Sequence, residues 1–157
     1  MRPWLISGLT LAADQLTKFV VAAAFHPGQS LPLLPGVLHL TYIQNTGAAF
    51  GLLKGWQLLF IGLSFAVIVW ILRQFLTKRS LAATTLWAYA LVLGGAAGNL
   101  IDRLRFGYVV DFIDVRVWPV FNLGDSAITI GVGLLVWRAL RKKGSNSLFE
   151  KGSSSLF

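Results

Sequence analysis

The chain has 157 residues, of which 55% are hydrophobic and 13% are charged, and its formal net charge is +8. A soluble domain carries about 25% charged residues, so this composition excludes an ordinary soluble fold and indicates an integral membrane protein. The basic residues cluster in short loops between apolar runs, as they do on the cytosolic side of membrane proteins, so nucleic-acid binding is not expected.

Four segments have the length and apolar character of membrane-spanning helices, which need about 20 residues. They are residues 3–25, 55–72, 80–101 and 120–137. The first segment contains Asp14 and Lys18 and lacks a small-residue cleavage pattern, so we expect a retained helix rather than a removed leader. The sequence predicts an all-α membrane protein with four transmembrane helices, formed by one domain over residues 1–143.

The basic residues also predict the orientation of the helices. Arg2, the loop of residues 73–79 and the cluster of residues 138–143 fall on one side of a four-span protein. Since basic loops remain in the cytosol, both termini are predicted to be cytosolic. The connections of residues 26–54 and 102–119 then face outward.

Both outer connections contain strand-like segments. Residues 37–44 alternate in polarity, and residues 108–118 are rich in β-branched and aromatic side chains. We therefore expect a small extramembrane β-cradle on the outer side. The Gly/Ser-rich residues 144–157 are predicted to form a disordered tail.

Five of the six acidic residues are aspartates in or beside the predicted spans: Asp14, Asp102, Asp111, Asp114 and Asp125. An ionised group in hydrocarbon costs about 2.5 kcal/mol or more, so it should face the interior of the bundle. Lys18 follows Asp14 by one helical turn, which favours an ion pair. A rise of 1.5 Å per residue puts Asp14 and Asp125 about 10 Å below the outer surface, so the site is expected near the outer leaflet.

Residue spacing groups further polar side chains. A stripe on the fourth helix and a cluster at the end of the third helix follow the i, i+3, i+4 pattern. The stripe comprises Asn122, Asp125, Ser126 and Thr129, and the cluster comprises Asn99, Asp102 and Arg103. In an extended segment, Asp111 would lie among β-branched residues, whereas Asp114 would share the opposite face with Arg116 as a solvated pair.

The residue types limit the chemistry that the chain can perform. There is no cysteine, and both histidines, His26 and His39, lie outside the predicted spans, so neither a zinc site nor a serine–histidine nucleophile is expected. Two carboxyl groups that share a site can hydrolyse an amide without a metal, because repulsion keeps one protonated while the other activates water. A pair of aspartates is thus the hydrolytic apparatus that the sequence supports.

Four segments resemble, in order, the motif blocks of the lipoprotein signal peptidases (signal peptidase II). They are Asp14-Gln15-Leu16-Thr17-Lys18, Asn45-Thr46-Gly47-Ala48-Ala49-Phe50, Gly98-Asn99-Leu100-Ile101-Asp102-Arg103 continuing to Val109-Val110-Asp111-Phe112, and Phe121-Asn122-Leu123-Gly124-Asp125. The resemblance covers residues 1–143. One departure is Gly124, where the family usually has alanine.

The resemblance implies an aspartic endopeptidase with Asp111 and Asp125 as the catalytic pair. It further implies that the following residues support the site or hold substrate: Asp14, Lys18, Asn45, Gly47, Asn99, Arg103 and Asn122. We add Asp102 to these supporting residues because of its position beside Arg103. The implied reaction removes the signal peptide of a diacylglyceryl-modified prolipoprotein just before the lipidated cysteine, with no cofactor or metal. The expected partners are such substrates, membrane lipid and globomycin-like peptide inhibitors. The protein is expected to be a monomer in the bacterial cytoplasmic (inner) membrane.

Asp102 is the rival candidate for catalysis. It lies beside Arg103 and one turn from Asn99, so we interpret it as an ion-paired structural carboxylate. Asp102→Asn is then expected to reduce stability more than chemistry, whereas Asp111→Asn should give a folded, inactive protein.

Two alternative functions remain open at this stage. Another type of intramembrane aspartic peptidase is one, but the segment before Asp125 lacks the first glycine of a Gly-x-Gly-Asp pattern. The other is a small transporter or proton-conducting subunit, in which membrane aspartates would relay ions. The absence of internal similarity between the two halves of the sequence argues against that alternative.

Overall fold

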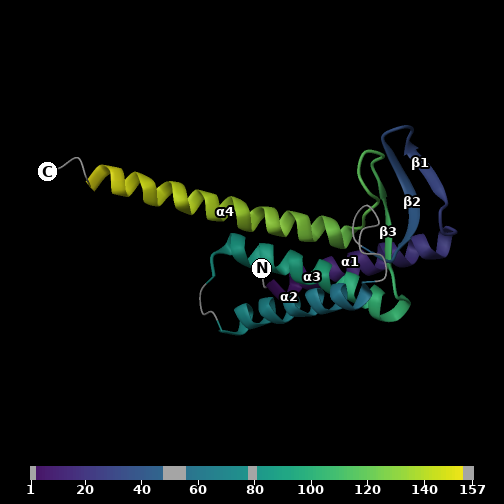
Figure 1. Ribbon diagram of the computed structural model, residues 1–157, viewed down its shortest axis with the longest axis horizontal. Coiled ribbons are helices and arrows are strands. Elements are labelled where there is room, and N and C mark those ends of the chain that lie inside the picture. The colour runs from purple at the N-terminus through teal and green to yellow at the C-terminus, as the bar shows by residue number, and fades with distance from the viewer. Residues whose placement is uncertain (1–2, 48–55, 78–80, 154–157) are drawn as a thin grey trace.

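The computed structural model describes residues 3–47, 56–77 and 81–153. In chain order its elements are α1 (Pro3–Ala24), β1 (Ser30–Leu34), β2 (Leu38–Asn45), α2 (Gln57–Thr77), α3 (Ala83–Phe106), β3 (Val109–Asp114) and α4 (Leu123–Ser153). The helices lie alongside one another, and the sheet stands at one end of the bundle (Figure 1). The predicted combination of a helical membrane bundle and a small β-cradle is confirmed.

Each of the four helices contains a stretch that is long and apolar enough to cross a membrane, which in α4 ends at Lys142. Two helices are longer than predicted, since α2 continues past residue 72 to Thr77 and α3 continues past residue 101 to Phe106. Arginine stems can lie along apolar surface with the charge in water, so a basic residue does not have to end a span. Asp102 and Arg103 consequently lie on α3, as their spacing from Asn99 predicted, and not in the outer connection, which was predicted to begin at residue 102.

The two ends of α4 also differ from the prediction. The helix begins at Leu123 rather than at residue 120, and it continues to Ser153, where the sequence predicted a disordered tail from residue 144. Residues 138–153 contain no proline, so nothing in this stretch interrupts the ladder of backbone hydrogen bonds.

The sheet is antiparallel, with the strand order β1-β2-β3. Asp111 on β3 is paired with Ile43 on β2, next to an irregularity in the register of β2. Val110 and Phe112 of β3 pack with Tyr42 of β2 and Val21 of α1 in one buried cluster. Because this cluster joins the sheet to α1, it fixes the position of Asp111 relative to the helices.

Helix α3 forms the centre of the bundle and is the most buried of the four helices. Its glycines let the neighbouring helices approach closely. A Cβ on Gly95 would meet the carbonyl oxygen of Gly124 on α4, and a Cβ on Gly94 would lie 2.7 Å from the carbonyl oxygen of Ser7 on α1. At Gly107 the backbone takes the left-handed conformation (φ 78°) and donates its N–H to Arg103 O, which ends α3 before β3 begins.

Candidate active site

Asp111 accepts hydrogen bonds on both carboxylate oxygens and is 1% exposed. Asn122 Nδ2 donates to Oδ1 at 2.6 Å, and Asn45 Nδ2 donates to Oδ2 at 2.8 Å. The Asn45 amide is held in this orientation because its own Oδ1 accepts the N–H of Gly47 at 2.9 Å. Gly47 therefore orients Asn45, and Asn45 in turn holds Asp111; both residues belong to the second motif.

Asp125 lies in the first turn of α4 and forms a reciprocal cap with Asn122. The Asp125 N–H donates to Asn122 Oδ1 at 2.8 Å, while the Asn122 N–H donates to Asp125 Oδ2 at 3.3 Å. This is the arrangement of a capping box, in which the cap residue and the third helical residue satisfy each other's backbone N–H groups. Asn122 was predicted to lie on the face of the helix, and it instead caps the helix and presents its Nδ2 to Asp111.

Asn99 connects Asp125 to the buried ammonium group of Lys18. Its Nδ2 donates to Asp125 Oδ1 at 2.8 Å, and its Oδ1 accepts from Lys18 Nζ at 2.7 Å and from Asn122 Nδ2 at 3.2 Å. Lys18 can only donate, so it forces the oxygen of Asn99 toward itself and the Nδ2 toward Asp125.

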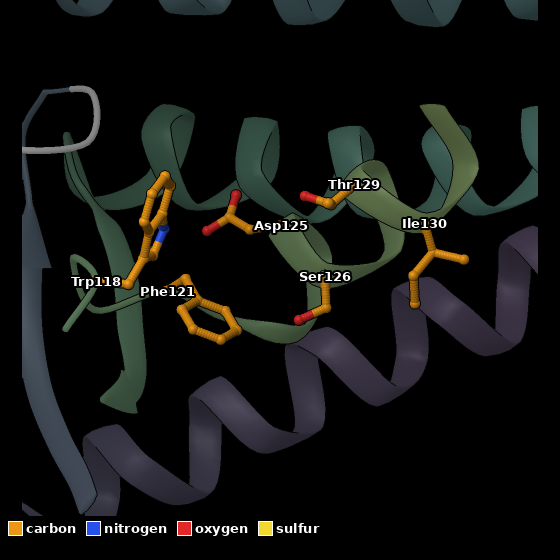
Figure 2. A pocket seen from close by; sticks show the side chains of 6 residues that line it. All are labelled: Trp118, Phe121, Asp125, Ser126, Thr129 and Ile130. Atoms are coloured by element: carbon orange, nitrogen blue, oxygen red, sulfur yellow. The ribbon is translucent and has the colours of Figure 1, made fainter. Parts of the chain in front are cut away.

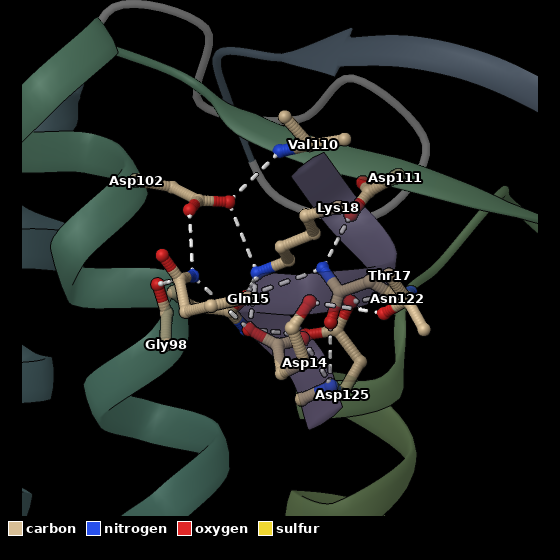
Figure 3. A network of polar contacts seen from close by, with 12 residues as sticks. Asp14, Gln15, Thr17, Lys18, Gly98, Asp102, Val110, Asp111, Asn122 and Asp125 are labelled. Carbon is tan, nitrogen blue, oxygen red and sulfur yellow. Dashed lines mark hydrogen bonds and ion pairs between the residues drawn. The ribbon is translucent and has the colours of Figure 1, made fainter. Parts of the chain in front are cut away.

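Lys18 lies between two carboxylates that are as buried as it is. Its Nζ is 2.9 Å from Asp14 and 3.0 Å from Asp102, and none of the three side chains is more than 3% exposed (Figure 3). The predicted pair of Asp14 and Lys18 is confirmed. Asp14 also accepts the Gly124 N–H at 2.8 Å, and a Cβ on Gly124 would lie 3.0 Å from this same carboxylate oxygen. The glycine at this position therefore gives Asp14 close access to α4.

Arg103 lies at the edge of the network, between α3 and α2, and lines one of the cavities. Its guanidinium lies 5.2 Å from the centre of the Phe60 ring on α2, and its Nη1 is 3.4 Å from the carbonyl oxygen of Asn99. Asp102 is ion-paired, but its partner is Lys18 on α1 and not the neighbouring Arg103 on which the sequence interpretation was based.

Burial and charge alter the titration of Asp111. Removal from water, followed by repulsion from Asp125, raises the pKa of Asp111 to about 7, against the hydrogen bonds from Asn45 and Asn122 that lower it. A carboxyl group with this pKa can carry either protonation state near neutral pH. That property is required of an acid–base pair.

Asp114 differs from its predicted environment. It is paired with Arg116 at 3.0 Å, but it is buried rather than solvated because Thr41 on β2 covers it and donates to it at 2.8 Å. Burial would raise the pKa of Asp114, yet the hydrogen bonds from Thr41 and Arg116 outweigh it and hold the pKa below its usual range. Asp114 thus belongs to the support of the sheet.

Two largely apolar cavities reach Asp125 from different sides. One has a volume of about 470 Å³ and is lined by Trp118, Phe121, Ser126, Thr129 and Ile130 (Figure 2). The other, of about 340 Å³, lies between α2, α3 and α4 and has Asn99 and Arg103 at its polar end. The site can therefore hold a molecule with apolar parts on both sides of a polar centre.

The structure brings eight predicted site residues into one connected set of side-chain contacts, and the remaining two, Gly47 and Arg103, join it through hydrogen bonds that involve the backbone. The eight are Asp14, Lys18, Asn45, Asn99, Asp102, Asp111, Asn122 and Asp125. The sequence interpretation missed the contacts of Gln15, although Gln15 belongs to the first motif. It also missed Phe60, Trp118 and Phe121, which line the cavities or contact Arg103. Among the described residues, no group of three His, Cys, Asp or Glu side chains is arranged to hold a metal ion.

Comparisons with known proteins agree with this arrangement. A sequence profile described as signal peptidase (SPase) II, of the peptidase A8 group, matches residues 6–141. The lipoprotein signal peptidase of Moorella thermoacetica is 50% identical over 143 residues, covering 89% of this chain and 93% of that protein. The lipoprotein signal peptidase of Halothermothrix orenii is 47% identical over 128 residues, covering 82% and 88%.

A solved structure agrees with the fold as well. A bacterial membrane enzyme determined by the in meso method at 2.3 Å resolution has a TM-score of 0.84 and 35% sequence identity, over 92% of this chain and 90% of that one. The profile match, over residues 6–141, includes parts of all four helices and the whole sheet. The chain therefore belongs to the signal peptidase II family, whose members are membrane peptidases that process prolipoproteins.

Proposed function

We propose that the protein is an aspartic endopeptidase in which Asp111 and Asp125 form the catalytic pair. The observation that carries this proposal is the position of Asn122, which donates to Asp111 while it forms a reciprocal cap with Asp125. One residue thus joins the buried carboxyl group of Asp111 on β3 and the half-buried carboxyl group of Asp125 on α4, at a point that two cavities reach.

The reaction needs one proton shared by the pair. The ionised carboxylate removes a proton from a water molecule as the water oxygen attacks the scissile carbonyl carbon. The protonated carboxyl group donates a hydrogen bond to the carbonyl oxygen and then transfers its proton to the leaving nitrogen, so the C–N bond breaks to give an acid and an amine. The two groups titrate as a unit, and either one can begin the cycle as the acid.

The proposed substrate is a prolipoprotein that carries a diacylglyceryl group on cysteine, cut just before that cysteine. An apolar signal peptide on one side of the scissile bond and acyl chains on the other match the two apolar cavities that meet at Asp125. Arg103 and Asn99, at the polar end of one cavity, are suited to hold the substrate backbone. Globomycin-like peptides would compete for the same position.

The remaining support comes from the buried charges. Lys18 orients Asn99, and Asp14 and Asp102 are both ion-paired with Lys18. Asn45, with Gly47, holds Asp111 from the side of the sheet. We further propose that the protein acts as a monomer in the bacterial cytoplasmic (inner) membrane, with both termini in the cytosol and the active site near the outer leaflet.

The test uses detergent-purified protein and a prolipoprotein with or without its diacylglyceryl group, with loss of the signal peptide followed by mobility. We expect cleavage of the lipidated substrate alone, and none by Asp111→Asn or Asp125→Asn. Asp114→Asn is the matched control, because it removes a buried carboxylate from the same strand without touching the pair. Cleavage that survives in either variant of the pair would refute the assignment, and a folded wild type that cleaves nothing would refute the proposed reaction.

A further inference from the structure

Gln15 on α1 contacts the central helix through its side-chain amide. Its Nε2 lies 3.0 Å from Asp102 Oδ1, 3.2 Å from the carbonyl oxygen of Gly98 and 3.4 Å from Asp14 Oδ2. All three partners are acceptors, so the amide can only take the orientation in which its nitrogen faces α3. In the family resemblance and in the proposed mechanism Gln15 has no role.

The other oxygen of Asp102 holds the strand that carries Asp111. Asp102 Oδ2 accepts the backbone N–H of Val110 at 3.1 Å and lies 3.0 Å from Lys18 Nζ. Val110 immediately precedes Asp111, and both Asp102 and Val110 are at most 3% exposed. Figure 3 shows the resulting path from Gln15 through Asp102 to the main chain next to Asp111.

We infer that Gln15 is a positioning residue for Asp111, acting through the Asp102 carboxylate and the Val110 N–H. The inference rests on the proposed function, in which Asp111 does the chemistry. Gln15 occupies Oδ1 of Asp102 and so leaves Oδ2 to Val110 and Lys18. Without the Gln15 donor, the carboxylate is free to rotate about its Cβ–Cγ bond and to turn both oxygens toward Lys18, which loosens the bond to Val110.

The surroundings of Gln15 separate this role from simple packing. Gln15 is half-buried and lines a small cavity of about 100 Å³ together with Phe19, Arg105 and Phe106. Because the side chain borders open space, an apolar residue of similar size is accommodated there without a new void. A change at this position should therefore act on the orientation of Asp102 more than on the packing of α1.

The first variant is Gln15→Leu, which keeps the size and removes the donor. We expect kcat to fall by about 10-fold to 100-fold at unchanged KM, since displacements of about 1 Å in a catalytic group have effects of this order. Hydrogen exchange of the Val110 amide should become faster in the same variant. In the control Arg116→Met, which changes a 49% exposed side chain just beyond the same strand, kcat and exchange at Val110 should remain as in the wild type.

The second variant, Gln15→Glu, tests the direction of the hydrogen bond. When the introduced carboxyl group is protonated, its O–H can donate to Asp102 Oδ1 as the amide does, and when it is ionised the two carboxylates repel. The ratio of variant to wild-type kcat should therefore be near one at low pH and should fall as the pH rises. In Gln15→Leu the same ratio should remain low and independent of pH.

Wild-type kcat and unchanged Val110 exchange in Gln15→Leu would overturn the inference. A lower kcat with unchanged exchange at Val110 would overturn it too, since the effect would then not pass through the strand. If the wild type cleaves no substrate, the proposed function fails, and Gln15 then has no role in catalysis through this path. The exchange measurement would still establish whether Gln15 holds Val110, so the two failures are distinguishable.

Discussion

At the scale of single residues, the site depends on amide side chains whose two ends are fixed by different partners. Asn122 receives a backbone N–H on its oxygen and donates to Asp111 with its nitrogen, and Asn99 is held in the same manner between Lys18 and Asp125. Such an amide cannot flip without losing both bonds. The aspartates are therefore held in place by groups that neither gain nor lose a proton.

The raised pKa of Asp111 predicts how the stability of the protein varies with pH. The folded state keeps a proton on this group up to about pH 7, whereas the unfolded chain releases it near 3.8. Stability attributable to Asp111 is therefore complete below about pH 4 and is lost as the pH rises to about 7, by up to about 1.4 kcal/mol per pH unit. Asp111→Asn cannot titrate at this position, so it does not lose this stability as the pH rises. The melting temperature of the variant minus that of the wild type should therefore increase between about pH 4 and pH 7 and then stay constant.

Asp114→Asn is the control for the sign of this effect. The pKa of Asp114 is lowered, so its contribution to stability is present above about pH 4 and disappears as the pH falls below that value. The variant should thus be less stable than the wild type at neutral pH and approach it in acid. A relative melting temperature of Asp111→Asn that does not change with pH would contradict the titration assigned to Asp111.

Lys18 is predicted to be the residue whose loss most reduces stability. Lys18→Met leaves Asp14 and Asp102 buried without a cation, and breaking a buried ion pair in this manner costs about 3–5 kcal/mol. Arg116→Met is the comparison, because that side chain is 49% exposed and exposed pairs contribute about 0–1 kcal/mol. Thermal denaturation in detergent micelles measures both variants, and an equal loss in the two would argue against the buried charge cluster.

At the scale of elements, α3 acts as the support on which the other parts are placed. Its glycines bring α1 and α4 close, while its polar end supplies Asn99 to α4 and Asp102 to α1 and β3. A helix in this central position can hold groups from three elements within hydrogen-bonding distance, because each neighbour touches a different face. This arrangement lets Asp111, on a strand outside the bundle, and Asp125, on a helix, take part in one polar network.

The close contact of α3 and α4 can be tested with a pair of glycine substitutions. In Gly95→Ala the new methyl group meets backbone atoms of Gly124, which cannot move aside as a side chain can, so the protein should be destabilised and Asp125 displaced. In Gly62→Ala, on α2, nothing lies within 4 Å of the new methyl group, and the change should stabilise the helix by about 0.5–1 kcal/mol. Melting temperature and cleavage rate together distinguish these outcomes, and a tolerated Gly95→Ala would contradict the predicted packing.

At the scale of the whole molecule, the distribution of charge predicts the orientation in the membrane. Native cysteine is absent, so single cysteines can report which side a position occupies. Val117, 89% exposed in the connection between β3 and α4, should be on the outer side, and Arg141, near the end of the span in α4, should be cytosolic. In intact cells a membrane-impermeant maleimide should label Val117→Cys, and it should label Arg141→Cys only after lysis. The reverse pattern would invert the predicted topology.

The sequence alone determined the class of the protein and most of the site. Four apolar segments of sufficient length require membrane helices, because backbone polar groups in lipid must be paired within the segment. The aspartates stood out because charge in an apolar span is costly, and the resemblance to the family motifs supplied the roles that we propose for them. Helical spacing also predicted the pair of Asp14 and Lys18, since its two residues lie one turn apart on one element.

Only the tertiary structure decided the contacts between elements. Thr41 buries Asp114 across two strands, and Gln15 reaches Val110 through Asp102 across three elements. Asn122 caps α4 because the chain turns into the helix at this residue, and spacing along the helix does not show where that turn lies. Spacing along one helix or strand contains no information about which face of another element it will meet. That choice is made by the packing of α3 against its neighbours, which is a property of the whole fold.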